Sequence, residues 1–543
     1  MLVGRWRINF LSFWFGAFRQ NCSLAGPTLR TVYKLLLGLC GLLLFACQPE
    51  TLHAPAEDGA VAESLSHAEV TQLVHARLVD GDVMRWSAFS DREVYSAGVA
   101  GDSLFALGYW ADDDLSAAPQ QIGLVDVEGP AWRKALDEIL APVLAIESAA
   151  AGRALTRAEL LVHGEPQGVP SVALRLATPE AVALLRADER VRYLEPMGFD
   201  PARDAVVARS SSGCGDDFNT AVAAADRRTV SPNATLPWNY DRHRIEQAWS
   251  LSRGDGIGVL VIDSGAGEGQ DNLGANFASG ESAGGRTVRR VSTLYSGSWW
   301  WRRLDGPDDD CGHGTQMSGL ACAPRSDDGN AVGVAYRSDL TAVRAVEDVV
   351  ISSSNESAGV RDALVLAGDD ASVRVISMSI GTPLYSSTVA DGVYYAANRG
   401  KLVLAAAGTS LSWTSWYGVI FPASMPEVVA VTGVRDDYPL RRCNTCHDGS
   451  AVEFAIVMQR AADSDRNSLS LTLAGDLPGY IGGSSAATAT TAGIAALVWA
   501  RDPSLSAAQV RERLARSGSN YPNRDGNLGW GLIDAEAAVG DPL

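Results

Sequence analysis

The chain has 543 residues, more than one typical domain contains, so its length predicts two or three domains. Hydrophobic residues make up 46% of it, which is enough for folded cores. The formal net charge of −19 argues against nucleic acid as a partner, because a phosphate-binding surface needs clustered Lys and Arg. An excess of acidic residues is typical of a soluble protein whose copies repel one another.

The N-terminal segment, residues 1–47, carries the pattern of an export signal. Basic residues precede an apolar run over 35–46, which has the length of a signal-peptide core and is too short to span a bilayer. The run ends Leu-Phe-Ala-Cys, which resembles the lipobox of bacterial lipoproteins, so Cys47 is the predicted lipidation site and its lipid would anchor the protein to a membrane. We expect an exported protein: a cell-envelope lipoprotein, with Gln48 favouring the outer membrane, or a secreted protein if an ordinary signal peptide is cut nearby.

Residues 48–135 are predicted to hold an acidic, Ala-rich tether and an N-terminal region in which we find no chemistry. Residues 136–198 are predicted to form a small α+β domain, with strands over 169–177 and 191–194 and a helix between them. The helix is expected to open at Thr178-Pro179-Glu180, because a proline in the first turn followed by an acid is typical of helix N-termini.

Residues 199–236, rich in Ala, Asp, Ser and Arg, have the composition of an exposed linker, and cleavage during maturation would fall there. In residues 237–543 apolar runs alternate with helical patterns, which predicts an α/β fold: a mostly parallel sheet with helices on both faces. The expected strands are 257–263, 340–346, 374–380, 402–407 and 428–434. The expected helices are 313–322, 359–367, 387–399, a helix that begins near residue 483, and 506–517.

Three polar residues in this domain stand where chemistry is expected. Asp263 directly follows an apolar strand, at the edge of the sheet where open α/β folds place their sites. His313 opens a helix and is one of three histidines, with His243 and His447, in this part of the chain. Ser485 lies at the start of a run of small residues that indicates a buried helix. A serine there is often only a cap, but the same free amides would stabilise negative charge beside a nucleophile.

The motifs around these residues resemble those of the subtilisin-like (subtilase) serine peptidases, in which Asp, His and Ser follow in this chain order. Here they read IDSG (Ile262 to Gly265), GHGTQMSG (Gly312 to Gly319) and GSSAATA (Gly483 to Ala489). The resemblance covers about residues 237 to 540 and implies a three-layer α/β domain. It also implies hydrolysis of peptide bonds through an acyl-enzyme, with Ser485 as nucleophile, although Ser484 is a rival.

The same resemblance implies further roles. His313 would be the base and Asp263 its orienting partner. An extended protein or peptide substrate would bind along the edge formed by the residues Ser379, Ile380, Gly381, Ala407 and Gly408. Residues 187–196 resemble the tail of the inhibitory propeptide that precedes subtilase domains, so the chain's own propeptide is a further expected partner, and the protein is expected to be made as a zymogen.

One departure from the family motifs bears on the expected rate of peptide hydrolysis. The family commonly carries an Asn that binds the oxyanion where this chain has Thr409, and loss of such a donor costs roughly 10² to 10³ in turnover. A catalytically weak or inactive binding protein with this fold is therefore the alternative function. A dinucleotide loop at Gly254 to Gly258 is disfavoured, because these glycines precede the strand instead of following it.

Eight cysteines are present. After export and lipidation five would remain, namely Cys214, Cys311, Cys322, Cys443 and Cys446. An odd number leaves one unpaired, most simply Cys214. Cys311 and Cys322 bracket the base and would clamp its helix, although a helix between them separates the sulfurs.

No metal site is predicted. Cys443 and Cys446 form half of a zinc pattern, but a second CxxC is missing, so a local disulfide in an exported loop is expected. The acidic run Asp308 to Asp310 is expected to be solvated. No cofactor is predicted; calcium is compatible with the composition but has no assignable site.

Overall fold

The computed structural model describes residues 64–79, 84–111, 119–201, 213–214, 221–297, 303–409 and 418–541. The predicted export signal, Cys47 and the first part of the predicted tether lie outside these ranges. The described residues belong to one compact unit, and none of their helices is long and apolar enough to cross a membrane.

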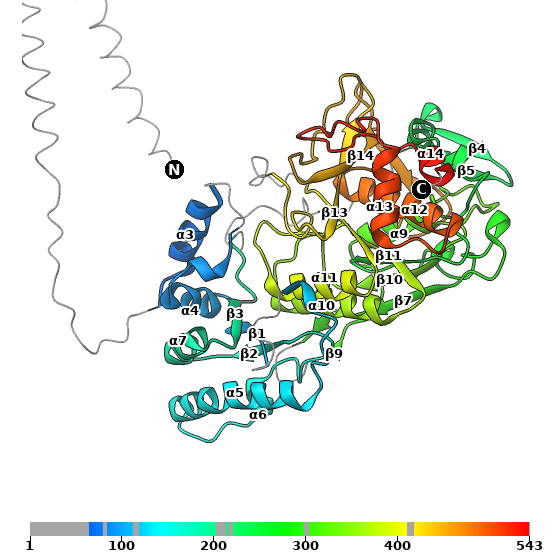
Figure 1. The fold of residues 1–543 in the computed structure, drawn as a ribbon. Helices are drawn as coiled ribbons and strands as arrows, with labels where there is room; N and C mark the ends of the chain where they lie inside the picture. Colours follow the sequence, from blue (N-terminus) through cyan, green and yellow to red (C-terminus); the bar gives the residue numbers. More distant parts are fainter. Residues whose placement is uncertain are drawn as a thin grey trace, which may run out of the picture. The chain divides into compact units, whose positions relative to one another are not determined.

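A seven-stranded sheet forms the centre of the C-terminal domain, and all of its neighbouring strands are parallel (Figure 1). The strand order is β14-β13-β12-β11-β6-β10-β7. The strands are β6 (Gly258–Asp263), β7 (Val288–Ser292), β10 (Asp339–Arg344), β11 (Val373–Met378), β12 (Leu402–Ala406), β13 (Val428–Arg435) and β14 (Val452–Gln459). Most are continuous buried apolar runs, as expected for strands covered on both faces. The predicted α/β fold is confirmed.

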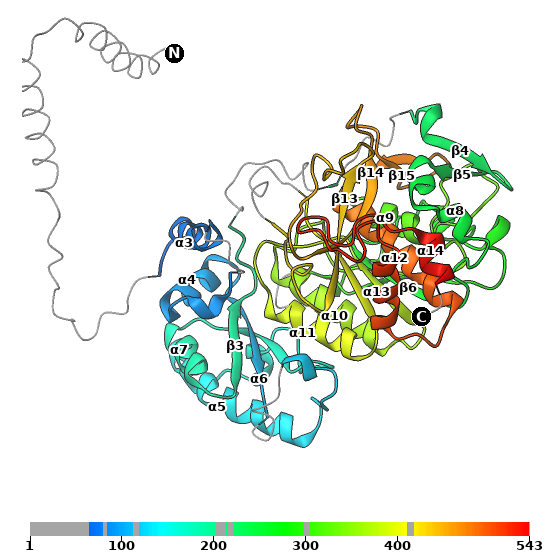
Figure 2. The same ribbon diagram turned by 45° about the horizontal axis from the view of Figure 1, so that its top comes forward.

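Helices cover both faces of this sheet, which makes three layers (Figure 2). The helices are α9 (His313–Cys322) and α12 (Gly483–Arg501) on one face and α10 (Ser354–Asp369) and α11 (Ser387–Asn398) on the other. Along β6, Val259 and Val261 pack into the core below α9 and α12, whereas Leu260 and Ile262 pack below α10 and α11. This alternation follows from the two-residue period of a strand.

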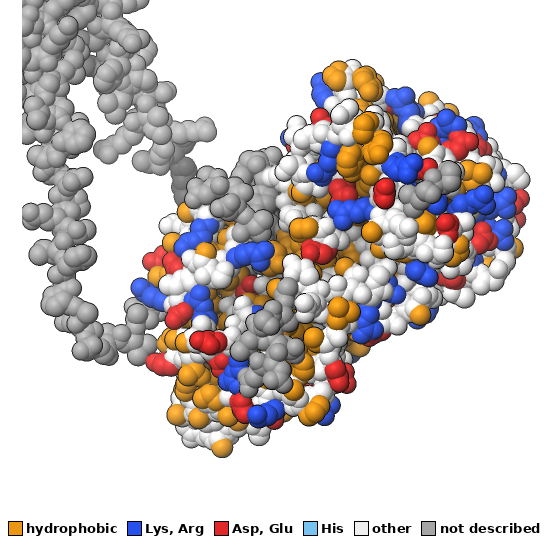
Figure 3. Space-filling model, in the orientation of Figure 1, with side chains coloured by type: hydrophobic (Ala, Val, Ile, Leu, Met, Phe, Trp, Pro, Cys, Tyr) orange, Lys and Arg blue, Asp and Glu red, His pale blue; other side chains and the backbone are white. Residues whose placement is uncertain are grey.

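Shorter elements complete the C-terminal domain. They are the hairpin β4 (Arg227–Val230) and β5 (Ala234–Pro237), the hairpin β8 (Tyr295–Ser296) and β9 (Arg303–Leu304), the hairpin β15 (Ser468–Ser470) and β16 (Gly479–Ile481), and the helices α8 (Ile245–Ala248), α13 (Ala507–Arg516) and α14 (Ala535–Gly540). On the face shown in Figure 3, acidic and basic side chains are interspersed over this domain, so the negative net charge is not gathered into one patch there.

The N-terminal domain is a three-stranded antiparallel sheet, in the order β2-β1-β3, whose helices share its hydrophobic core. Its strands are β1 (Leu104–Tyr109), β2 (Ser171–Arg175) and β3 (Val191–Pro196). Its helices are α3 (His67–Val79), α4 (Asp91–Ala100), α5 (Pro130–Ala151), α6 (Arg157–Leu160) and α7 (Pro179–Ala187). Helix α7 begins at Pro179, and Thr178 accepts a hydrogen bond from the Ala181 amide as its N-cap, as its sequence predicts.

The domain limits differ from those expected from sequence at two places. Strand β1 is the central strand of the N-terminal sheet and helix α5 spans residue 136, so this domain begins well before the predicted boundary at 135/136. The hairpin β4–β5 overlaps the end of the predicted linker 199–236. Asp226, directly before β4, is fully buried and pairs with Arg460 and Arg466 of the C-terminal domain, so this part of the segment belongs to that domain and is not an exposed linker.

Candidate active site

Asp263 and His313 meet at the carboxyl edge of the sheet. Asp263 is the last residue of β6, His313 is the first residue of α9, and His313 Nδ1 lies 2.8 Å from Asp263 Oδ1 with both side chains buried. Because a carboxylate only accepts, Nδ1 is the donor of this bond, and in the neutral form of the ring Nε2 is then the acceptor nitrogen. The glycine after the histidine is needed for close approach, since a Cβ on Gly314 would collide with the backbone of Gly265.

The other two histidines of this domain have structural roles. The ring of His243 is buried between the Ile533 carbonyl and the Val457 amide, and burial lowers its pKa to about 4. His447 is also buried, against the Gly418 carbonyl, and burial lowers its pKa. Of the three, His313 is therefore the one that pairs with a carboxylate, as predicted for the base.

Asp309 anchors the turn that carries His313. One of its carboxylate oxygens accepts from the Ser264 hydroxyl at 2.9 Å and from the Cys311 and Gly312 amides, and the other accepts from the Thr315 amide and hydroxyl. Asp309 is 3% exposed, so the prediction that Asp308 to Asp310 are all solvated is wrong for this residue. Asp309 therefore accepts hydrogen bonds from the first turn of α9 and from Ser264, directly after β6, and so holds the start of the helix at the end of the strand.

Ser485 and Ser484 point to different partners in the first turn of α12. Ser485 is 7% exposed, and its hydroxyl donates to the Ser379 carbonyl at 3.3 Å, while Ser379 Oγ donates to the Ser485 carbonyl at 2.9 Å. Ser484 is fully buried, and its hydroxyl donates to the Gly408 carbonyl at 2.7 Å. Ser484 is thus committed to the interior, whereas Ser485 lies at the cavity described next.

A cavity of about 40 Å³ adjoins Ser485. It is lined by Val349, Val350, Ser379, Ile380, Gly381, Thr382, Pro383, Ala406, Gly408, Thr409, Ile420 and Ser485. The predicted substrate-binding residues Ser379, Ile380, Gly381 and Gly408 are among them. Ala407 does not line the cavity. It is fully buried, and its backbone amide and carbonyl are bonded to Val431 and Ile420.

The predicted substrate edge is closed by the protein itself. The Gly381 amide donates to the Val349 carbonyl at 3.1 Å, and the Gly381 carbonyl accepts from the Ile351 amide at 3.0 Å. The sequence predicts that this edge pairs with an extended peptide, but in this structure both backbone groups of Gly381 are bonded to the protein itself. Strand addition at Gly381 therefore requires the segment around Val349 to move.

Comparison with known proteins identifies the family. The family model described as the subtilase family matches residues 254–531, just over half of the chain. The chain belongs to the subtilase family. M-protease of Shouchella clausii (strain KSM-K16) is 26% identical over 384 residues, which cover 70% of this chain and 81% of that protein.

Subtilisin Savinase of Lederbergia lenta is 28% identical over 310 residues, which cover 56% of this chain and 99% of that protein. Minor extracellular protease Epr of Bacillus subtilis (strain 168) is 28% identical over 387 residues, which cover 70% of this chain and 51% of that protein. The protein is accordingly a serine-type endopeptidase, a hydrolase.

The disulfides of this subtilase differ in part from those expected. Cys443 and Cys446 are bonded to each other, as predicted. Cys214 is bonded to Cys311, and Cys322 is buried and free, so the predictions of an unpaired Cys214 and of a Cys311–Cys322 clamp are both wrong. The helix α9 separates Cys311 from Cys322, whereas the described residue Cys214 lies beside the turn that precedes the helix.

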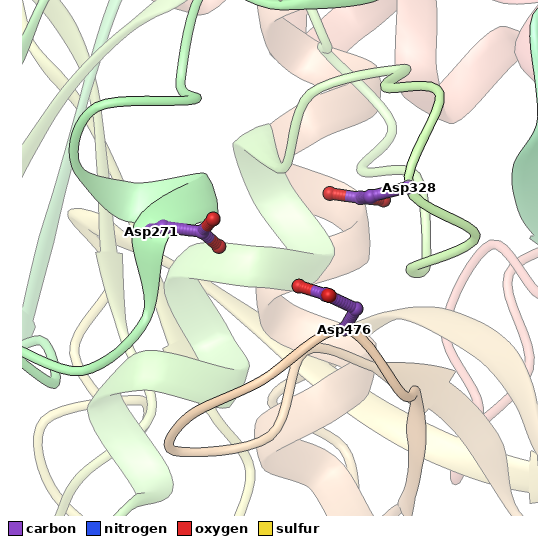
Figure 4. A group of neighbouring side chains, drawn as sticks. All are labelled: Asp271, Asp328 and Asp476. Atoms are coloured by element: carbon purple, nitrogen blue, oxygen red, sulfur yellow. The ribbon is translucent and has the colours of Figure 1, made fainter.

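Three carboxylates of the subtilase domain lie within 4.8 Å of one another and point toward a common centre: Asp271, Asp328 and Asp476 (Figure 4). Donors of the protein already satisfy part of their charge, since Asn276 Nδ2 donates to Asp271 and Asn272 Nδ2 donates to Asp328. Among the described residues this is the group with the ligand type that a hard cation prefers. Sequence reasoning missed it because the three acids are far apart in the chain, Asp271 at the start of a short 3₁₀ helix and Asp328 and Asp476 in two separate loops.

Proposed function

We propose that this serine endopeptidase works through a triad of Ser485, His313 and Asp263. The observation that carries the proposal is the buried hydrogen bond between His313 and Asp263, at the carboxyl end of β6. Strand β11 is the neighbour of β6 in the sheet, and Ser379, directly after β11, contacts Ser485. Neighbouring strands lie about 4.8 Å apart, so both halves of the triad belong to the same short stretch of the sheet edge.

The proposed reaction is acyl transfer to Ser485 and then to water. His313 Nε2, left as an acceptor by the bond at Nδ1, takes the Ser485 proton and later gives it to the leaving amine. Asp263 holds the ring in that tautomer and stabilises the imidazolium. The first amide of α12 with a bond inside the helix is that of Ala486, which donates to the Gly482 carbonyl. The Ser485 amide comes one residue earlier, in the first turn, so it can donate to the oxyanion.

Thr409 is the proposed side-chain donor to the oxyanion. It lines the cavity beside Ser485, and its hydroxyl lies 3.5 Å from where a Cβ on Gly483 would be, which places it over the start of α12. A threonine hydroxyl is shorter than the amide that the family commonly uses, so a weaker interaction with the oxyanion is expected.

Changing Thr409 tests this role. Thr409→Val keeps the shape and removes the donor, so turnover should fall by roughly 10- to 10³-fold with little change in substrate affinity, because the bond forms only in the transition state. Thr409→Asn should raise turnover. Steady-state kinetics on one peptide substrate measure both; a Thr409→Val enzyme equal to the parent would assign the role to another donor.

We further propose that the N-terminal domain is an inhibitory propeptide of this enzyme. It is held against the N-termini of α10 and α11 by acids, with Asp102 accepting from the Ser354 hydroxyl and Glu195 from the Ser387 amide and hydroxyl at 2.9 and 2.6 Å. The positive end of a helix dipole favours carboxylate acceptors there, but for Glu195 burial outweighs this effect and raises the pKa. Arg192 adds a buried ion pair with Asp391.

This interface is expected to weaken as the pH rises. Burial raises the pKa of Glu195 to about 7, although its bonds with Ser387 lower it. A carboxyl whose pKa is raised in the docked state stabilises docking when protonated, and that contribution is lost between the ordinary pKa of about 4.5 and pH 7. Glu195→Gln should match the parent in thermal stability at pH 5 and exceed it increasingly toward pH 8. A difference that does not change with pH would contradict this.

Export with a lipid at Cys47 is proposed from the sequence pattern alone. Expressed in a bacterial host, the full chain should take up labelled palmitate and fractionate with membranes, and Cys47→Ser should be unlabelled and soluble. An unlabelled, soluble parent protein would reject lipidation and leave simple secretion.

A further inference from the structure

A disulfide joins the segment between the two domains to the turn before the proposed base. Cys214 belongs to the region that follows the N-terminal domain, and its partner Cys311 lies two residues before His313, 97 positions further along the chain. The family match begins at residue 254, so Cys214 lies before it and Cys311 within it. The bond therefore ties a segment outside the matched domain to its active site.

The residue before Cys214 lies beside the proposed base. A Cβ on Gly213 would be 3.1 Å from Val349 Cγ1 and 3.8 Å from His313 Cδ2. Val349 lines the cavity beside Ser485. The absence of a side chain at Gly213, whose φ is +85°, lets the backbone pass this closely between the imidazole and Val349.

Gly213 also packs on the segment that closes the substrate edge. Val349 carries the carbonyl that accepts from the Gly381 amide, and Ile351 carries the amide that donates to the Gly381 carbonyl. With Gly213 against the Val349 side chain and Cys214 bonded to Cys311, this closed arrangement is braced by a covalent bond. An extended peptide has to displace both layers to reach Gly381.

Cleavage of the backbone does not remove this brace. If the chain is cut before Gly213, residues 213 and 214 stay with the catalytic domain, beside His313. If it is cut after Cys214, the N-terminal domain stays attached to Cys311 through the disulfide. In either case the segment is released only when the disulfide opens.

The remaining cysteines of the described residues do not open it by exchange. Cys322 is fully buried, and burial raises the pKa of its thiol to about 12, so it is scarcely ionised at neutral pH. Cys443 and Cys446 are buried and bonded to each other. Cys214 is partly buried whereas Cys311 is buried, so Cys214 is the more exposed residue of the bonded pair.

We infer that the chain's own Gly213–Cys214 segment holds Val349, and with it the substrate edge, in the closed arrangement, and that an external dithiol must reduce the Cys214–Cys311 disulfide before a peptide binds. One thiolate of the dithiol attacks Cys214, Cys311 leaves as a thiolate, and the second thiol of the reductant then displaces Cys214. Two cysteines are reduced and the dithiol becomes a disulfide. The inference rests on the proposed function, because it concerns access to the same site.

The first test compares hydrolysis before and after reduction. Full-length protein purified under oxidising conditions is assayed with a peptide anilide, without and with excess dithiothreitol. The parent should gain roughly 10-fold or more on reduction, because the competent state is otherwise rarely populated. Cys214→Ser should be active without reductant and indifferent to it. Cys443→Ser/Cys446→Ser, which lacks the other disulfide, should respond to reductant as the parent does.

The second test separates this inference from catalysis. In the Ser485→Ala protein, binding of a fluorescent extended peptide is measured by anisotropy in both redox states. Binding that tightens roughly 10-fold or more on reduction supports the inference that the Cys214–Cys311 disulfide restricts access of the peptide. Equal binding in both states, or a parent that hydrolyses equally in both, overturns it. If binding by the Ser485→Ala protein tightens on reduction but the parent hydrolyses peptide in neither redox state, the proposed function alone is contradicted.

Discussion

Ser485→Ala is expected to lower turnover by roughly 10⁶-fold, to a residual rate supplied by binding and the oxyanion site. The reason is that the substitution removes the nucleophile, while the cavity, His313 and Asp263 stay in place. Stability should change little, since among the described residues the bond that the hydroxyl donates is a long one, to the Ser379 carbonyl. Turnover of a peptide substrate by the reduced, full-length protein measures the effect.

The matched control is Ser484→Ala, one residue away in the same turn. The Ser484 hydroxyl donates to the Gly408 carbonyl in the protein interior, so this variant should lose about 1 kcal/mol of stability. It should keep a measurable rate of peptide hydrolysis. A protein that survives Ser485→Ala and is silenced by Ser484→Ala would reverse the assignment of the nucleophile.

Asp263→Asn is expected to lower turnover by roughly 10⁴-fold. An asparagine amide can donate to His313 Nδ1, which would place the ring proton on Nε2 and leave no base for Ser485. Substrate affinity should change far less than turnover, because the loss is one of proton transfer. Kinetics over a range of substrate concentrations separate the two.

Asp310→Asn serves as the control for loss of a nearby acid. The Asp310 side chain is 79% exposed and pairs with Arg344 at 2.8 Å, so its removal should leave turnover within about twofold of the parent. A comparable loss in both variants would mean that the charge around the turn matters, and not the orientation of His313.

Most strands of the sheet and their helices were predictable, because buried strands are short continuous apolar runs and the helices between them have a helical spacing of apolar residues. The run that ends at Asp263 is apolar on both faces, and α9 and α11 begin at the residues expected, His313 and Ser387. Strand β1 was missed as the centre of the N-terminal sheet, since its pairing with β3 joins segments some 90 residues apart and no local pattern reports it. Both edge strands of the large sheet were missed: β7, whose charged, partly exposed residues lack alternation, and β14, for which no strand was predicted although all of its residues are buried.

The residues of the candidate site were predicted, but their surroundings were not. Three neighbouring acids look alike in sequence, and only the inward turn of the loop distinguishes buried Asp309 from exposed Asp310. Pairing of Cys214 with Cys311 is a long-range property that cysteine spacing does not encode. The closing of Gly381 by Val349 likewise depends on a loop and not on a motif.

Covalent labelling of the reduced, full-length protein with a fluorophosphonate, followed by peptide mapping, tests the central claim most directly. The reagent reacts with an activated serine, so one adduct is expected, on Ser485, and it should be absent from Ser485→Ala and strongly reduced in Asp263→Asn. An adduct on Ser484, or no adduct although the protein is folded and its groove binds peptide, would contradict the proposed triad.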